Sequence, residues 1–378
     1  MKTLRHFTLS LAVATFVTIA PVIVDGPARA QQAGVHLTEN GYRVPIYGVA
    51  LVTDADGHVG TACAQLTTAQ IESLRFTRSV SRSMMASYPR STVQATTGVT
   101  AATFEIIYTD AAGTGFLDPA KGPARRGAMI ATVAAWSAVL QGTVPIVIQA
   151  SMKAPENPES TTLASAGPVD FATIDGRLVP TALAWQLRGG RLAASTVDIE
   201  VSVNPNIDWD YAANGAAAPN KPSFVYTMIH EVGHGLGFLS TFDLETGAML
   251  NPLPTPFDVF INRGSSSRNP LTSRSSTQVK EDLIGGDLFF SGPKTTEASA
   301  RSIRPLPMVK LFAPNPYEPG SSTSHVDQET YADFKVGLMA PKDFGSGTDK
   351  IDILTLDVME DMGYKLVPDA VTARVTRQ

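Results

Sequence analysis

The sequence contains a single cysteine, Cys63, among its 378 residues, so no disulfide bond can form within one chain. A chain of this length can fold without disulfides because it can bury a large core, and 43% of its residues are hydrophobic. Cys63 itself has two main interpretations: a small buried apolar residue, or a thiolate that binds a metal ion in a latent precursor. An exposed thiol or a disulfide to another chain is a further alternative.

Basic residues are not in excess, since 30 Lys and Arg stand against 35 Asp and Glu, for a formal net charge of −5. The sequence has no basic run that would bind the phosphates of a nucleic acid. The hydrophobic content is also too high for a disordered chain. We therefore expect a folded protein that has no nucleic-acid partner.

Long apolar runs are absent except at the N-terminus, where one covers positions 7–24. Lys2 and Arg5 precede this run, and the small residues of an Ala-Arg-Ala sequence ending at Ala30 follow it. This order is typical of an export signal that is cleaved after Ala30 rather than of a membrane anchor. We expect residues 1–30 to be a signal peptide and the mature protein to be soluble, secreted or periplasmic, with no stable membrane insertion.

Composition divides the rest of the chain into regions. Residues 31–97 form an N-terminal region, which ends near the Ser- and Thr-rich stretch 91–100 and is interpreted as a pro-segment or an accessory domain. Residues 98–366 form the main domain. Within it, positions of about 263–324 are rich in Ser, Pro, Gly and Asn and predict a loop-rich insertion. Residues 367–378 form a polar C-terminal tail.

Strand and helix patterns alternate through the main domain, which favours an α+β fold with a sheet packed on two long helices. Strands are expected at 103–110, 143–152 and 198–204; helices at 67–88, 124–142 and, as a short helix or turn, 181–187; and a hairpin at 47–60.

Histidine is scarce, with six in the chain, yet His230 and His234 lie four residues apart in the segment 226–240, YTMIHEVGHGLGFLS. An apolar stripe at helical spacing predicts a helix here (Val225, Ile229, Val232, Leu236). On a helix the two imidazoles lie on one face, about 5–6 Å apart at Cβ, and can bind one tetrahedral zinc ion. Glu231 points about 100° away from His230, where it can bind a water on the metal as a general base.

A zinc ion that does chemistry needs a third protein ligand and one open position. The compact pattern H-E-x-x-H-x-x-G-x-x-H has its glycine here as Gly237, but Ser240 stands at the last position, and serine is a poor zinc ligand. The third ligand must therefore come from elsewhere. His325 is the remaining downstream histidine, and the carboxylates of Asp243 and Glu245 are the alternatives.

This arrangement resembles the metzincin zinc peptidases and, within them, the leishmanolysin-like branch. In that branch the third histidine lies far downstream of the helix after an insertion, and a methionine turn follows it. The matching residues here are His230, Glu231, His234, Gly237, His325 and Met339. The segment 355–364, TLDVMEDMGY, is similar to the closing helix of these proteins. The branch's namesake is rich in disulfides and this chain has none, so the likeness is to bacterial relatives.

The resemblance implies that residues 98–366 are a metallopeptidase catalytic domain. Its expected fold is a twisted sheet packed on two long helices, with an active-site helix and a C-terminal subdomain that carries the methionine turn. In the family this methionine forms an apolar floor under the metal ligands. Plain core packing is the other interpretation of Met339, and both can hold together.

The expected function is an exported zinc-dependent endopeptidase with a polypeptide substrate, one catalytic Zn²⁺ and Glu231 as general base. Two alternatives stay open: an exported zinc-binding adhesion or binding protein without proteolytic activity, and a hydrolase of other amides or esters. The strand at 199–203 is expected to offer an edge for an extended peptide. Surface Asp and Glu residues leave Ca²⁺ binding open, although no loop motif specifies it.

Overall fold

The computed structural model describes residues 35–38, 40–53, 59–65, 87–95, 100–155, 161–191, 197–266, 268–300, 308–331, 337–343 and 347–368. The predicted signal peptide, most of the predicted helix at 67–88 and most of the C-terminal tail lie outside these residues. The description below concerns the unit that begins at Ala33.

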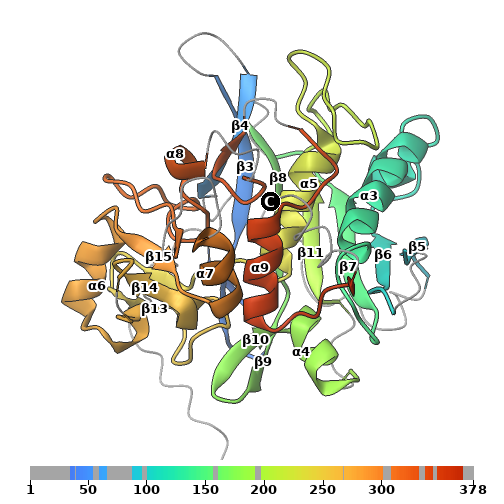
Figure 1. Cartoon of the computed structure of the whole chain (residues 1–378). Coiled ribbons are helices and arrows are strands. Elements are labelled where there is room, and N and C mark those ends of the chain that lie inside the picture. The colour runs from blue at the N-terminus through green and yellow to red at the C-terminus, as the bar shows by residue number, and fades with distance from the viewer. Residues whose placement is uncertain are drawn as a thin grey trace, which may run out of the picture. The chain divides into compact units, whose positions relative to one another are not determined.

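An eight-stranded mixed sheet forms the centre of the described chain, in the order β17-β4-β3-β8-β11-β7-β6-β5 (Figure 1). Three central strands, β6, β7 and β11, run parallel, and every other neighbouring pair is antiparallel. In chain order the strands are β3 (Tyr47–Thr53), β4 (Val59–Gln65), β5 (Arg90–Val93), β6 (Phe104–Tyr108), β7 (Ile146–Met152), β8 (Thr162–Pro168), β11 (Ile199–Val203) and β17 (Lys342–Asp343).

The N-terminal region contributes three strands to this sheet. β3 and β4 pair in the predicted hairpin, from Tyr47 opposite Gln65 to Thr53 opposite Val59. β3 also pairs with β8, and β4 pairs with β17, so the hairpin lies between two strands of the main domain. The stretch predicted as a linker contains most of β5, which pairs with β6. Whether residues 31–97 are a pro-segment stays a prediction.

The strand β11 differs from its prediction. The strand is present at Ile199–Val203, but it has no free edge, because it pairs with β7 on one side and β8 on the other. Its apolar side chains are fully buried, as is typical of central parallel strands. The expectation that this strand offers an edge to a peptide is therefore wrong.

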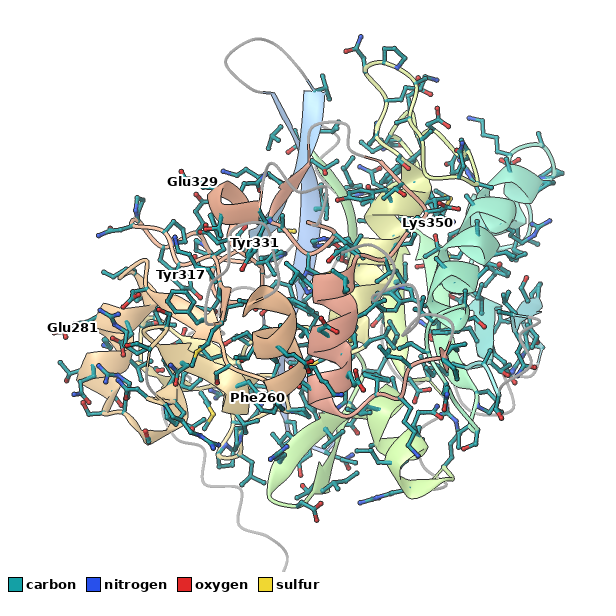
Figure 2. All side chains as sticks on the ribbon, in the orientation of Figure 1. Phe260, Glu281, Tyr317, Glu329, Tyr331 and Lys350 are labelled. Atoms are coloured by element: carbon teal, nitrogen blue, oxygen red, sulfur yellow. The ribbon has the colours of Figure 1, made fainter. Side chains whose placement is uncertain are left out.

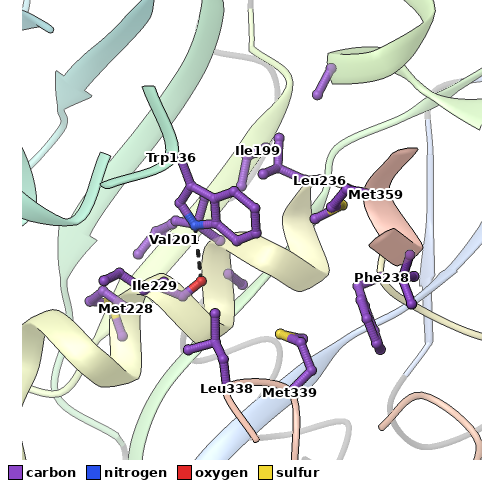
Figure 3. Packing of buried hydrophobic residues seen from close by; sticks show 14 of the residues in the cluster. Trp136, Ile199, Val201, Met228, Ile229, Leu236, Phe238, Leu338, Met339 and Met359 are labelled. Atoms are coloured by element: carbon purple, nitrogen blue, oxygen red, sulfur yellow. Dashed lines mark hydrogen bonds between the residues drawn. The ribbon is translucent and has the colours of Figure 1, made fainter. Parts of the chain in front are cut away.

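Two long helices, α3 (Gly122–Ser137) and α5 (Phe224–Gly235), pack on each other and against the sheet (Figure 1). The indole of Trp136 on α3 donates a hydrogen bond to the carbonyl of Ile229 on α5, at 3.1 Å (Figure 3). α3 ends at Ser137 rather than Gly142. Beyond it, the carbonyl of Leu140 accepts a bond from the amide of Ala102 at 2.8 Å, and Leu140 forms a bridge with Leu366.

The remaining elements surround this core. The helices are α4 (Thr181–Arg188), α6 (Ser276–Leu283), α7 (Pro293–Ala300), α8 (Gln328–Tyr331) and α9 (Ile353–Met362), with single 3₁₀ turns η1 (Gly115–Leu117), η2 (Asp258–Phe260) and η3 (Leu271–Ser273). The outer strands are β1 (Val35–Leu37), β2 (Arg43–Pro45), β9 (Phe171–Ile174), β10 (Arg177–Pro180), β12 (Phe242–Asp243), β13 (Ala248–Met249), β14 (Ile261–Arg263), β15 (Leu288–Phe290) and β16 (Val309–Lys310). None of the described helices is both long and apolar enough to cross a membrane.

The segment predicted as a loop-rich insertion is more structured than its composition suggested. β14, β15 and β16 form a small antiparallel sheet, and α7 packs on α9. Leu288, Phe290 and Val309 have no exposed surface, so the segment joins the core through short apolar runs between its polar loops. The charged side chain of Glu281, on α6, lies on its outside (Figure 2). The predicted α+β architecture is confirmed at the level of a mixed sheet packed with helices.

Candidate metal centre

The helix α5 forms where the histidine motif predicts it. Ser223 caps its first turn, because the Ser223 hydroxyl accepts a hydrogen bond from the Tyr226 amide at 3.2 Å. Every residue of the helix is buried, so its two histidines face the interior of the protein. His234 has no exposed surface and His230 has 5%.

Three imidazoles meet at this helix. The Nε2 atom of His234 lies 3.0 Å from that of His230 and 3.1 Å from that of His325, and the third pair is 3.3 Å apart. Around a tetrahedral zinc ion with Zn–N bonds of about 2.0–2.1 Å, two nitrogens lie about 3.3–3.4 Å apart. The three nitrogens are thus spaced as ligands of one small ion.

The opposite ring nitrogens fix the protonation of these histidines. Each Nδ1 donates to a backbone carbonyl: His230 to Leu338 at 2.6 Å, His234 to Phe238 at 2.7 Å, and His325 to Ser321 at 2.7 Å. A neutral imidazole carries one proton, so all three Nε2 atoms present lone pairs to one another. Burial, together with the neighbouring histidines, lowers the pKa of His234 and of His325 well below its usual range. Converging lone pairs of neutral imidazoles are what a cation requires.

Cys63 supplies a fourth potential donor atom to this cluster. The sequence had left two main interpretations of Cys63 open, a buried apolar residue or a metal-binding thiolate. Its Sγ lies 3.1 Å from Nε2 of His230, and the ligand atoms of Cys63, His230, His234 and His325 all lie within 4.8 Å of one another. The backbone of Cys63 is held on both sides, by the carbonyl of Pro341 at 2.7 Å and the hydroxyl of Ser321 at 2.6 Å. Burial, with the charge of nearby Glu231, raises the pKa of the thiol.

Glu231 lies on α5 between the two histidines and has no exposed surface. Neither of its carboxylate oxygens has a hydrogen-bond partner among the described residues. Burial raises the pKa of Glu231 well above its usual range, and the amide of Ala166 offsets this shift in part without making a full hydrogen bond. A buried carboxylate without partners is costly unless it serves a ligand or a reaction.

Met339 and the motif glycines pack around the histidines. Met339 is fully buried, and its sulfur lies against α5 at Gly233 (Figure 3), where an added Cβ would come within 2.9 Å of Sδ. Gly237 has a φ of 112°, and a Cβ there would lie 2.8 Å from Pro180, which explains the glycine at this position of the motif. The turn that carries Met339 also contains Leu338, whose carbonyl orients His230.

The alternative third ligands lie outside the cluster. The carboxylate of Asp243 accepts bonds from the amide and hydroxyl of Thr246, both at 2.8 Å, and so closes a local turn. Glu245 is exposed at the surface. Among the described residues, the group of His, Cys, Asp and Glu side chains with metal-binding geometry is Cys63, His230, His234 and His325. The calcium prediction therefore gains no candidate site there.

Tyr47 is a further residue of the centre that sequence reasoning missed. Its ring, from β3, stacks on the imidazole of His234 with 4.7 Å between ring centroids and 24° between planes. It meets the ring of His325 edge-on at 6.3 Å. Tyr47 lies on strand β3, 183 residues before His230, and no local sequence signal marks such a contact.

A narrow recess reaches the centre from the surface. It is lined by residues of β3 and β4, by the start of α5 and by residues 340–342, and it ends at Cys63 and His230. The cluster is therefore buried but adjacent to an opening on the side of the N-terminal hairpin.

Comparison with known proteins adds one similarity. Residues 127–268 match the model of a family described as SPBPB7E8-like. The matched part is less than half of the chain; it includes His230, Glu231 and His234 but neither Cys63 nor His325. No curated protein matches the chain. No solved structure matches it either.

Proposed function

We propose that this chain is an exported zinc-dependent endopeptidase of the metzincin type, similar to the leishmanolysin-like branch. One observation carries the proposal: three neutral imidazoles converge beside Glu231, a buried carboxylate without a hydrogen-bond partner. The donor set suits zinc, since imidazole nitrogens and a thiolate are its usual ligands. The glycine and methionine of the family pattern, Gly237 and Met339, support the proposal by packing beside the centre.

In this proposal His230, His234 and His325 hold the ion. Zinc, when bound, supplies a Lewis acid that makes water more acidic and polarises a carbonyl oxygen. Glu231 accepts a proton from the water that attacks the peptide carbonyl, and then delivers that proton to the amine as the C–N bond breaks. The raised pKa of Glu231 suits both steps, because the group can hold the proton between them.

Cys63 makes the described arrangement an inhibited form in this proposal. A catalytic zinc ion keeps one position open, whereas the thiol of Cys63 lies where it would take the fourth place of an ion held by the three histidines. The hairpin of β3 and β4 that carries Cys63 lies between β8 and β17, next to the centre. Turnover would require the thiol of Cys63 to move away from the three imidazoles, and residues 31–97 would then act as the inhibitory segment of a precursor.

A second function is favoured by the same thiol. Four protein ligands with no open position are typical of structural zinc sites. The alternative is therefore an exported zinc-binding adhesion or binding protein without proteolytic activity, in which Cys63 stays bound.

The deciding experiment replaces the base and the thiol separately. Cys63→Ser should raise hydrolysis of casein by the full-length protein, because it frees the fourth position. Adding Glu231→Gln to that variant should leave zinc content unchanged and lower the hydrolysis rate by about 10²–10⁴-fold.

Glu245→Gln is the matched control, since Glu245 is an exposed glutamate in the segment that follows the same helix. This variant should cleave casein at the rate of its Cys63→Ser parent. A Cys63→Ser protein that binds zinc and cleaves nothing would favour the structural-zinc alternative, and equal cleavage with Gln at position 231 would refute the role of Glu231.

A further inference from the structure

The third imidazole lacks the helix that positions the other two. His325 follows an irregular segment in which Thr323 has a φ of 67°, a left-handed conformation that is costly for a β-branched residue. Such a conformation persists only where surrounding contacts hold it. The amide of Thr323 donates to the carbonyl of Phe312 at 2.7 Å, and the contacts of the next residue, Ser324, add to that hold.

Ser324, Ser240 and Tyr47 form a closed ring of hydrogen bonds. The amide of Ser240 donates to Oγ of Ser324 at 2.9 Å, and the hydroxyls of Ser324 and Tyr47 lie 2.6 Å apart. The hydroxyl of Tyr47 donates to the carbonyl of Ser240 at 3.0 Å. The phenol has a single proton, so Ser324 must be the donor to Tyr47, and each group in the ring then gives one bond and accepts one.

All three residues are buried, with exposed fractions of 0% for Ser324, 3% for Ser240 and 6% for Tyr47. Inside the protein each of these bonds is expensive to break, because water cannot replace the lost partner. The ring therefore joins the segment after α5 to the residue that precedes His325. It also fixes the aromatic ring that stacks on His234.

Ser240 stands where a compact zinc motif would place its third histidine. We infer that this position still serves the third ligand, through its backbone: Ser240 anchors Ser324, and Ser324 and Tyr47 are positioning residues that hold His325 at the metal centre. The inference rests on the metal centre of the proposed function. The inference gives the N-terminal hairpin a second role in addition to carrying the thiol of Cys63, because Tyr47 contacts both His234 and His325.

The test measures zinc affinity of the full-length protein by competition with a chromogenic chelator. Tyr47→Phe keeps the stacking on His234 and removes one hydroxyl; Ser324→Ala removes the other. Each should weaken zinc binding by about 10–100-fold, as loss of a group that orients a metal ligand does. Ser324→Thr, which keeps the hydroxyl, should restore most of the affinity.

Two control variants match these changes in chemistry and burial. Tyr331→Phe removes a buried phenol that accepts from the Lys310 amide at 2.9 Å, on α8 (Figure 2). Ser322→Ala removes a buried hydroxyl of the same segment that accepts from the Glu318 amide at 3.0 Å. Both controls should change zinc affinity by no more than about twofold, because neither hydroxyl takes part in the ring of bonds between Tyr47, Ser240 and Ser324.

Cobalt substitution gives a readout that general destabilisation would not change. The visible spectrum of the Co²⁺ protein should change in Tyr47→Phe and Ser324→Ala and stay constant in the two controls. If Ser324→Ala does not fold, Tyr47→Phe decides alone. Unchanged zinc affinity in Tyr47→Phe, or equal losses in the controls, would overturn the inference.

The outcome is separate from that of the proposed function. Loss of zinc affinity in these variants, with no peptide hydrolysis by any form of the protein, would support the positioning role and reject the peptidase. Hydrolysis by the Cys63→Ser protein, together with unchanged zinc affinity in the Tyr47 and Ser324 variants, would support the peptidase and reject the positioning role.

Discussion

The two sides of the candidate metal centre are built in different ways. On the helix side, α5 places His230 and His234 one turn apart, and a capped helix in the core keeps that spacing without help from distant residues. On the loop side, His325 lies in an irregular segment that is fixed by bonds to remote parts of the chain. Examples are the bonds from Phe312 to the carbonyl of His325, at 2.9 Å, and from Ser321 to the carbonyl of Cys63, at 2.6 Å.

This difference shows that the donor positions a metal site needs can be provided by different kinds of local structure. The ion requires three or four donors at fixed distances, whatever their separation in sequence. Local periodicity supplies two donors at little cost. The remaining donors require a folded core to hold them, so the loop side should respond to changes far from it and the helix side should not.

Removal of a single imidazole should have the largest effect, and it should be equal on the two sides. His234→Ala and His325→Ala should each weaken zinc binding by about 10²–10³-fold, because a binding energy of about 10–16 kcal/mol is shared among four donors. Competition with a chelator measures this. Asp243→Ala should bind zinc like the parent, since Asp243 closes a local turn. Zinc retained by His325→Ala and lost by Asp243→Ala would reverse the assignment.

The sequence predicted the helix side well, because its signals are local. The spacing of the apolar residues was enough to place His230, His234 and Glu231 on one helix, which is buried in the structure. His325 could be proposed only because few histidines were left. Tyr47 and the pairing of β11 on both edges depend on which segments meet after folding, and composition and periodicity carry no such information. The same holds for the choice between the two interpretations of Cys63.

Truncation of Met339 should have the next largest effect and should separate packing from metal binding. Met339→Ala should lower the free energy of unfolding by about 2–3 kcal/mol, the lower part of the range for buried methionine, because a turn can partly collapse into the space. Met339→Leu should cost less than about 1.5 kcal/mol. Denaturant unfolding of the zinc-free protein measures both changes. A zinc affinity that falls with Leu as much as with Ala would mean that the thioether acts on the centre directly.

Glycine substitutions in α5 and just after it should have smaller effects that differ by position. A Cβ at Gly235 would lie 2.4 Å from Cγ2 of Ile199, a rigid branched side chain (Figure 3), so Gly235→Ala should cost about 1–3 kcal/mol. Gly237→Ala should cost a similar amount because of its positive φ. Gly233→Ala meets the flexible end of Met339 and gains about 1 kcal/mol of helix propensity, so its net effect should be close to zero. Thermal melts of the three variants would show whether sterics or propensity decides.

The smallest effects concern two carboxylates that make similar bonds in opposite surroundings. Asp118 accepts bonds from the amides of Lys121 and Ala120 just before α3, at 2.8 Å each, and these bonds lower its pKa. Asp258 accepts from the amide and hydroxyl of Thr241, next to Ser240, but burial raises its pKa. Carbon-13 NMR titration of the two carboxyl groups should therefore give a pKa below the ordinary aspartate value of about 3.9 for Asp118 and a pKa above it for Asp258.

The consequences for stability have opposite signs. Asp118 has a lower pKa in the folded state, so its contribution is present above the unfolded pKa and is lost as pH falls through the folded value. Asp258 has a higher pKa in the folded state, so its contribution is complete below the unfolded pKa and is lost as pH rises through the folded value. The stability difference between parent and Asp258→Asn should therefore shrink as pH rises, while that for Asp118→Asn grows. If the two stability differences changed in the same direction with pH, burial would not control the pKa of Asp258, which bonds to the residue next to Ser240. The loop side would then depend less on the buried core than the contrast with α5 requires.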